Sequence, residues 1–233
     1  MRLGGLARLF LVLLLSTATP ARAGGAEALL DATGQKQSLV DIIALEPQAL
    51  ALAGHNAQRA GDTLRLHLRS GREKVYRDTP ACANDKADDP SPQCHQFKLL
   101  AHARDWGLYV VVKAYYEAAE YFLVDDTTGD EVVLRSFPLF SPSGMQVLVL
   151  NVEDDEAGHL AQIWRHAQNG FALDWSGKPY ADERGWQDIE YSLVRWVSES
   201  RIAMKATLWF EAPPSQIEKA FELRLTDRGW TLR

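Results

Sequence analysis

Apolar and polar residues alternate along much of the chain after residue 61, which is the period of two expected of half-buried β-strands. The first example is TLRLHLRSGREKVYRD, residues 63–78. Its leucines share one face, its first basic side chains share the other, and Ser70 and Gly71 mark a turn. The pattern predicts a strand with one buried face and one solvated, basic face.

Short apolar segments then follow one another quickly, with turn residues between them. About twelve or thirteen candidate strands result, and their short connections favour antiparallel neighbours. The later segments are 97–103, 107–114, 120–126, 131–137, 145–151, 160–166, 170–175, 189–197, 201–211, 220–227 and 229–233.

Residues 24–60 differ in composition, because they are rich in Ala, Leu and Gln. They predict one or two short helices that are interrupted at Pro47 and end near Gly54 and Gly61. We therefore predict an all-β fold. An N-terminal helical or irregular segment, residues 24–60, would precede a single β domain, residues 61–233.

Residues 121–151, YFLVDDTTGDEVVLRSFPLFSPSGMQVLVLN, resemble one blade of the TolB-like and WD40-like β-propellers. In those repeats a strand ends in an acidic turn with glycine, a second strand follows, and a Ser-Pro-Asp-Gly turn leads to a third. Here Ser143 stands in place of the aspartate, and weaker similarities surround Gly71 and Gly177. The resemblance implies a scaffold of blade-like sheets and brings no active site with it.

The length of the chain limits how such blades assemble. A blade takes about 40–50 residues, so the 233 − 23 = 210 residues after residue 23 have room for about four at most. We expect an antiparallel meander of blade-like sheets that forms a sandwich, an open barrel or a small incomplete propeller. A sandwich or open barrel is preferred to a small closed propeller, because the internal similarities support only three blades.

The first 23 residues have the three parts of a secretory signal peptide. Arg2 and Arg8 are basic, residues 6–15 are almost entirely apolar, and Ala21-Arg22-Ala23 is a cleavage site of small residues. The apolar run is shorter than the ~20 residues that a membrane span needs. We predict cleavage after Ala23 and a soluble protein in a bacterial periplasm, with a retained N-terminal anchor as the alternative.

The charge of the chain narrows the choice of partners. The formal net charge is −6 at pH 7, and removal of the arginine-containing signal peptide makes the protein more acidic. Nucleic acids and anionic lipids need a concentrated basic face. We therefore expect neither of them as a partner.

The two cysteines, Cys82 and Cys94, enclose the polar segment ANDKADDPSPQ. An even pair around a polar loop in an exported chain predicts a disulfide. A redox or metal role is the alternative. The spacing is not that of a CxxC site, and His95 alone does not complete a tetrahedral ligand set, so we expect no metal and no cofactor.

Familiar catalytic patterns are missing from the sequence. The six histidines lack metal-ligand spacing, which predicts surface or hydrogen-bonded side chains. The serines lack the Gly-x-Ser-x-Gly setting of a nucleophile elbow, and neither a P-loop nor a dinucleotide-binding glycine pattern is present. We assign no catalytic residue.

Seven tryptophans are many for this length. Those within apolar strand patterns are expected in the core, namely Trp164, Trp196 and Trp209. The turn-rich segment DWSGKPYADERGW contains the better candidates for an exposed aromatic patch, namely Trp175, Tyr180 and Trp186.

Acidic side chains are concentrated in two loops, which we call together the acidic pole. The pole comprises Asp125, Asp126, Asp130, Glu131, Glu153, Asp154, Asp155 and Glu156. If segments 120–124, 131–135 and 145–151 run up, down and up in one meander, both loops lie exposed at one end of one sheet. Asp105 would lie at that end and the cysteine loop at the other.

Three interpretations of the acidic pole are possible. Its carboxylates are solvated loop charges, a docking surface for a basic protein or peptide, or a calcium site at DDTTGD, residues 125–130. Two functions follow. The first is a non-catalytic binding or interaction protein that presents loops from a β scaffold. The alternative is a cell-envelope hydrolase with paired, glycosidase-like carboxylates beside Trp175 or Trp186.

Overall fold

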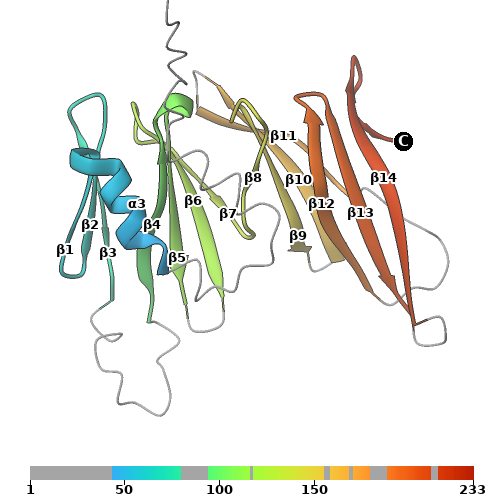
Figure 1. The fold of residues 1–233 in the computed structure, drawn as a ribbon, viewed down its shortest axis with the longest axis horizontal. Helices are drawn as coiled ribbons and strands as arrows, with labels where there is room; N and C mark the ends of the chain where they lie inside the picture. The colour runs from blue at the N-terminus through green and yellow to red at the C-terminus, as the bar shows by residue number, and fades with distance from the viewer. Residues whose placement is uncertain are drawn as a thin grey trace, which may run out of the picture.

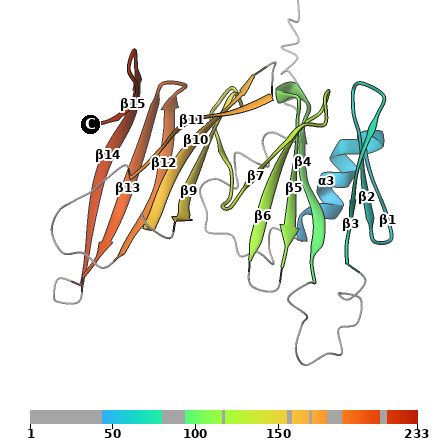
Figure 2. The same ribbon diagram turned by 180° about the vertical axis from the view of Figure 1, so that it is seen from behind.

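Four antiparallel β-sheets stand in a row in the computed structural model, which describes residues 44–79, 94–115, 118–154, 158–167, 170–178, 188–210 and 215–233 (Figure 1). The strands of each sheet follow one another in sequence, so each sheet is a meander. Along the row the chain runs from the first sheet to the fourth, and the C-terminus lies at the far end (Figure 2).

The sheets have three or four strands each. The first sheet contains β1 (Ala57–Ala60), β2 (Thr63–His67) and β3 (Glu73–Arg77). The second contains β4 (Gln96–Ala103), β5 (Leu108–Ala114), β6 (Ala119–Asp125) and β7 (Glu131–Leu134). The third contains β8 (Leu139–Phe140), β9 (Gln146–Asp154), β10 (Gly158–Ala167) and β11 (Gly170–Gly177). The fourth contains β12 (Asp188–Ser198), β13 (Arg201–Trp209), β14 (Gln216–Thr226) and β15 (Gly229–Leu232).

The two middle sheets are buried on both faces, which explains their continuous apolar runs. Successive side chains of a strand point to opposite faces. On β5, Val110 and Val112 join the core between the second and third sheets, whereas Tyr109 and Val111 join the core between the first and second. The third and fourth sheets share a further core, to which Leu148 of β9 belongs.

The fourth sheet ends the row with a polar outer face. Arg201 pairs with Glu222 at 2.9 Å, and Lys205 pairs with Glu218 at 2.7 Å. These pairs join neighbouring strands across the sheet. A face of this kind stays in water and needs no further covering layer.

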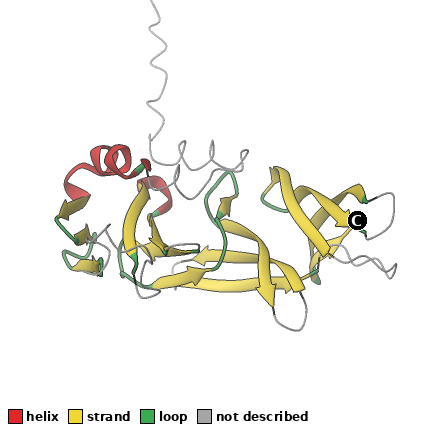
Figure 3. Cartoon of the chain, turned by 90° about the horizontal axis from the view of Figure 1, so that it is seen from below, coloured by secondary structure: helices red, strands yellow, loops and turns green. Residues whose placement is uncertain are grey.

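A single described α-helix, α3 (Glu46–Ala53), packs against β4 at the other end of the row (Figure 3). Pro47 occupies the first helical turn, where its missing N–H costs no hydrogen bond. The helix ends at Gly54, as predicted, whereas the residues before 44, on which the predicted interruption at Pro47 depends, lie outside the described residues. Two 3₁₀ turns, η1 (Gly54–Asn56) and η3 (Arg104–Trp106), follow α3 and β4.

Glu46 fixes the helix to the sheets, although it is almost fully buried. Its carboxylate lies 2.8 Å from the Arg59 guanidinium and 3.5 Å from the Lys98 ammonium, and it accepts a hydrogen bond from the backbone N–H of Leu99 at 3.1 Å. Arg59 also pairs with Asp78 at 3.1 Å. Buried charges persist where they are paired in this way.

The all-β prediction is confirmed, and the described sheets stack as an open, sandwich-like row. Residues 121–151 do not form one blade, however. Strands β6 and β7 complete the second sheet, and β8 and β9 begin the third. The similarity to a propeller repeat therefore covers the junction between two sheets. Among the described residues, no helix is long and apolar enough to cross a membrane.

Candidate functional site

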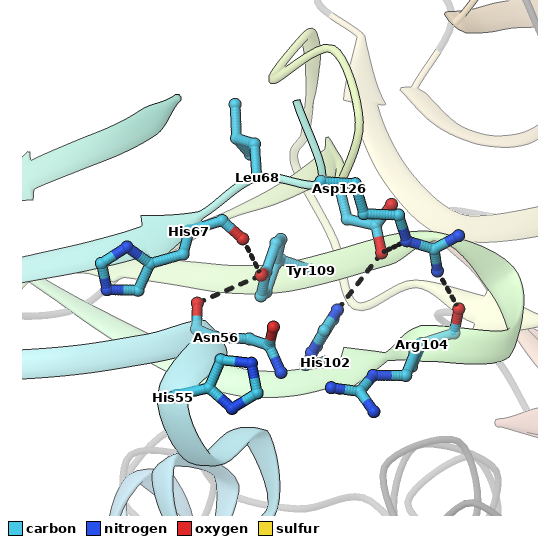
Figure 4. A pocket seen from close by; sticks show the side chains of 9 residues that line it. His55, Asn56, His67, Leu68, His102, Arg104, Tyr109 and Asp126 are labelled. Atoms are coloured by element: carbon cyan, nitrogen blue, oxygen red, sulfur yellow. Dashed lines mark hydrogen bonds and ion pairs between the residues drawn. The ribbon is translucent and has the colours of Figure 1, made fainter. Parts of the chain in front are cut away.

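A cavity of about 360 Å³ lies at one end of the first two sheets, where η1, the β2–β3 turn, η3 and the β6–β7 turn meet (Figure 4). Residues of these connections and of three strands line it, namely His55, Asn56, His67, Leu68, Arg69, His102, Arg104, Tyr109 and Asp126. These residues are far apart in sequence, so the cavity forms only when the two sheets pack together.

Asp126 is the one carboxylate among the described residues that line the cavity, and its residue is only 1% exposed. Its Oδ2 lies 2.9 Å from Nε of Arg69 and 3.3 Å from Nε2 of His102, while the Thr127 hydroxyl donates to its Oδ1 at 3.3 Å. Its backbone N–H donates to the Gly107 carbonyl at 2.9 Å. Asp126 is therefore fixed in place and electrically balanced.

His102 presents one ring nitrogen to Asp126 and keeps the other unpaired. An ionised carboxylate only accepts hydrogen bonds, so Nε2 carries the proton. Nδ1 is then left with a lone pair and has no hydrogen-bond partner in the described part of the chain. Burial lowers the pKa of His102, and the hydrogen bond and charge of Asp126 offset this effect only in part. The ring is therefore neutral near pH 7.

Tyr109 forms one wall of the cavity and ties the two sheets together. Its ring stacks on His102 with the centroids 4.1 Å apart and the planes 15° from parallel. Its hydroxyl donates to the carbonyl oxygens of His67, at 2.6 Å, and Asn56, at 3.1 Å. Burial and the charge of Asp126 raise the pKa of Tyr109 to about 12, so its proton stays in place at neutral pH.

Arg104 and His55 contribute the exposed side of the cavity. No described residue forms an ion pair or hydrogen bond with either side chain. In Figure 4 the side chains of Arg104 and His55 both lie below His102. The cavity therefore combines one balanced carboxylate with cationic and potentially cationic groups that have no partner in the described chain.

Asp125 makes a second histidine pair outside the cavity. Its Oδ2 lies 3.0 Å from Nε2 of His166, which belongs to β10, and its Oδ1 accepts from the backbone N–H groups of Thr127 and Thr128. Burial opposes ionisation of Asp125, but the hydrogen bonds from Thr128, His166 and Thr127 outweigh it and lower the pKa of the carboxyl. The adjacent carboxylates of Asp125 and Asp126 thus link the second sheet to both neighbouring sheets.

The exposure predicted for the acidic pole is wrong at two positions. Asp125 and Asp126 are buried, because their carboxylates join neighbouring sheets. Asp130 is exposed, as expected, and Asp105 lies in η3 at the same end of the second sheet. Two of the carboxylates expected to bind calcium, Asp125 and Asp126, already accept hydrogen bonds from protein groups and are not free to act as ligands.

The two loops of the acidic pole also lie at opposite ends. Asp125 contacts His166, whose backbone N–H donates to the carbonyl of Met145 just before β9 begins. Glu153 and Asp154 end this nine-residue strand, about 25 Å further along its axis. The reason is β8, an additional short strand that reverses the chain once more before β9. Asp155 falls outside the described residues.

The predicted aromatic patch is only partly described. Trp175 packs against the core between the third and fourth sheets, so it is not a free platform residue. Tyr180 and Trp186 lie outside the described residues. Trp209, which was expected in the core, is 40% exposed. The predicted disulfide stays a prediction, because Cys82 is not among the described residues, although Cys94 lies at the end of β4 away from the cavity.

The described side chains limit the chemistry of the site. They include no group of three or more His, Cys, Asp or Glu side chains placed to hold a metal ion. The single carboxylate of the cavity does not form the pair that a glycosidase needs, which lies about 5–10 Å apart. What the cavity offers is the guanidinium of Arg104, three histidine rings and the fixed carboxylate of Asp126, which are polar groups able to hold a ligand.

Sequence reasoning missed the residues of the cavity, apart from Asp126. Their positions carried a weak signal. His102 interrupts the apolar run LLAHA, residues 99–103, and a buried strand histidine needs a hydrogen-bond partner. The general expectation that histidines are surface or hydrogen-bonded side chains agrees with His102, His166 and the exposed His55.

The fold and site were compared with known proteins. No protein-family model, no curated protein and no solved structure matches this chain.

Proposed function

We propose that this chain is an exported, non-catalytic binding protein whose β scaffold presents a ligand pocket at one end of its first two sheets. The observation that carries the proposal is the cavity itself, in which polar groups from four separate connections converge on a space of about 360 Å³. Cavities of about 300–1,000 Å³ with a few fixed polar groups are typical ligand sites. His102, Tyr109 and Asp126 are held by packing and hydrogen bonds, so the pocket is preformed.

The pocket replaces the acidic pole as the proposed binding site. A basic protein or peptide was expected to dock where the two acidic loops met, but Asp125 and Asp154 lie at opposite ends of the sheets. No observation on the described residues favours the hydrolase alternative. The pocket has one carboxylate, and Tyr109 keeps its proton at neutral pH.

The place of action is proposed from the N-terminal segment. Residues 1–23 have the composition of a signal peptide, and Gly24 would be the first residue of the mature protein. The chain would then work in the bacterial periplasm. This assignment also supports the proposed Cys82–Cys94 disulfide, because that compartment is oxidising.

The proposal is tested by asking whether the pocket retains a small molecule. The purified protein is incubated with a small-molecule extract of the same cells, separated by ultrafiltration, and its retained compounds are identified by mass spectrometry. His55→Trp fills the exposed side of the cavity, and Arg228→Trp places the same ring on an exposed turn of the fourth sheet. We expect a compound that the wild type and Arg228→Trp retain and His55→Trp does not.

Other outcomes would contradict the proposal. If the three proteins retained the same compounds, the cavity would not be the binding site. If a compound disappeared on incubation and a cleaved product took its place, the hydrolase alternative would be favoured.

A further inference from the structure

The charges around the cavity are unbalanced in favour of positive charge. Asp126 is its one described carboxylate, and Arg69 neutralises it at 2.9 Å. The groups that remain around this pair are Arg104, His55 and His102, while His67 is paired with Glu73 at 3.3 Å. This surplus stands out because the whole chain has a formal net charge of −6.

Arg104 differs from several other exposed basic residues in having no partner. Arg165 pairs with Asp174 at 3.0 Å, Arg201 with Glu222 at 2.9 Å, and Lys205 with Glu218 at 2.7 Å. Among the described residues, none pairs with the guanidinium of Arg104. A guanidinium offers parallel N–H donors that match the two oxygens of a carboxylate or phosphate.

His102 becomes a hydrogen-bond donor toward the cavity, in addition to Arg104 and His55, when it takes up a second proton. Its Nε2 is committed to Asp126, so the proton enters at Nδ1, which has no partner in the described part of the chain. Asp126 stabilises the resulting positive charge from the opposite side of the ring. The titratable and charged groups around His102 in the cavity are Asp126 of the β6–β7 turn, Arg69 of the β2–β3 turn, Arg104 of η3, His55 of η1, His67 of β2 and Tyr109 of β5.

We infer that the pocket binds a small oxyanion, a ligand with a carboxylate or phosphate group, between Arg104, His55 and His102. The inference rests on the proposed binding function and specifies the chemical class of its ligand. The anion stabilises protonated His102, so anion affinity increases as the pH falls and His102 takes up its second proton.

The test measures binding of inorganic phosphate and of citrate to the purified protein by isothermal titration calorimetry at about pH 7.5 and pH 5.5. Arg104→Gln and His55→Gln remove donors from exposed positions, so both variants are expected to fold. Arg228→Gln is the matched control, because it removes an exposed arginine from the fourth sheet. Maltose serves as a neutral probe and lysine as a cationic probe.

We expect at least one of the two anions to bind, with roughly tenfold weaker affinity in Arg104→Gln, since a charge-assisted hydrogen bond is lost. Arg228→Gln should bind like the wild type, and wild-type affinity should be higher at the lower pH. Equal binding by all variants, or no binding of either anion, would overturn the oxyanion inference. Binding of maltose or lysine that His55→Gln abolishes would also overturn it, while leaving the proposed binding function intact.

Discussion

Nε2 of His102 and Oδ2 of Asp126 lie 3.3 Å apart, although the histidine belongs to β4 and the aspartate to the turn after β6. Arg69 of the first sheet reaches the same oxygen at 2.9 Å. This one carboxylate therefore holds together the floor of the cavity and the junction between the first two sheets. Its structural role can be tested separately from the proposed binding function.

Replacement of Asp126 by alanine should reduce the free energy of unfolding by about 2–3 kcal/mol, because His102 and Arg69 lose a buried acceptor. Asp130→Ala is the matched control, since Asp130 lies exposed in the same turn, and it should change stability by no more than about 0.5 kcal/mol. Urea unfolding followed by tryptophan fluorescence measures both. Equal effects of the two substitutions would show that the buried carboxylate has no special role.

Stability should also depend on pH through His102. Burial lowers the pKa of this side chain below its ordinary value of 6.5. The unfolded chain therefore takes up the proton at a higher pH than the folded protein does. The contribution of His102 to the free energy of unfolding is complete above the ordinary pKa, and it is lost as the pH falls through the lower pKa of the folded protein. We expect the free energy of unfolding to fall between about pH 7.5 and pH 5.5.

His102→Gln should make that dependence shallower, because glutamine retains a donor for Asp126 but does not titrate. His55→Gln is the control, since it makes the same substitution at an exposed histidine of the same cavity. The measurement is urea unfolding at a series of pH values. An unchanged slope in His102→Gln would assign the pH dependence to other groups.

Gly144 should not tolerate a side chain. Its φ is +72°, and a β-carbon there would overlap the ring of Trp106, which packs on Phe140 of β8. Gly229 has a φ of +99° and nothing within 4 Å, so Gly229→Ala carries the backbone strain alone. Gly144→Ala should cost about 1–3 kcal/mol more than Gly229→Ala, because the core must shift. Thermal and urea unfolding of the two variants would reveal the difference, and equal losses would contradict the overlap.

The strands could be predicted from the sequence because their signal is local. Runs such as YVVV, residues 109–112, combine strand-forming side chains with flanking turns, and burial on both faces accounts for their lack of alternation. The direction in which each strand runs within its sheet was harder to predict. β8 has only two residues, Leu139 and Phe140, and missing its reversal moved Glu153 and Asp154 to the wrong end of the sheets.

The cavity could not be predicted because it depends on packing between sheets. Asp126 was noticed as part of an acidic turn, but nothing local indicates that Arg69 and His102 lie beside it. Arg69 and His102 are 57 and 24 positions from Asp126 in sequence, and they contact it only when the strands and sheets have packed together. An aspartate pair directly after an apolar strand was the one local sign of a buried carboxylate.

Export should remove the first 23 residues. In a bacterial host, the protein should be recovered from the periplasmic fraction with Gly24 as its first residue, as intact-mass and N-terminal sequencing would show. A chain that starts at Gly24 without the signal segment should remain in the cytoplasm, which provides the control. Recovery of an uncleaved chain from the membrane fraction would support the retained anchor instead.

The Cys82–Cys94 disulfide should stabilise the protein without being needed for its fold. The base of the loop that the bond would close is already held, because the backbone N–H of Thr79 donates to the His95 carbonyl at 3.1 Å and the N–H of His95 donates to the Thr79 hydroxyl at 2.9 Å.

Reduction, or replacement of Cys82 by serine, should therefore lower the free energy of unfolding by about 3 kcal/mol and leave the circular dichroism spectrum unchanged. Alkylation followed by mass spectrometry, with and without reductant, shows whether the bond is present. Reductant should have no effect on the stability of Cys82→Ser, which separates loss of the bond from other effects of the reagent. Two reactive thiols in the exported protein, or an unfolded Cys82→Ser variant, would contradict this prediction, because the three inter-sheet cores remain intact when the bond is lost.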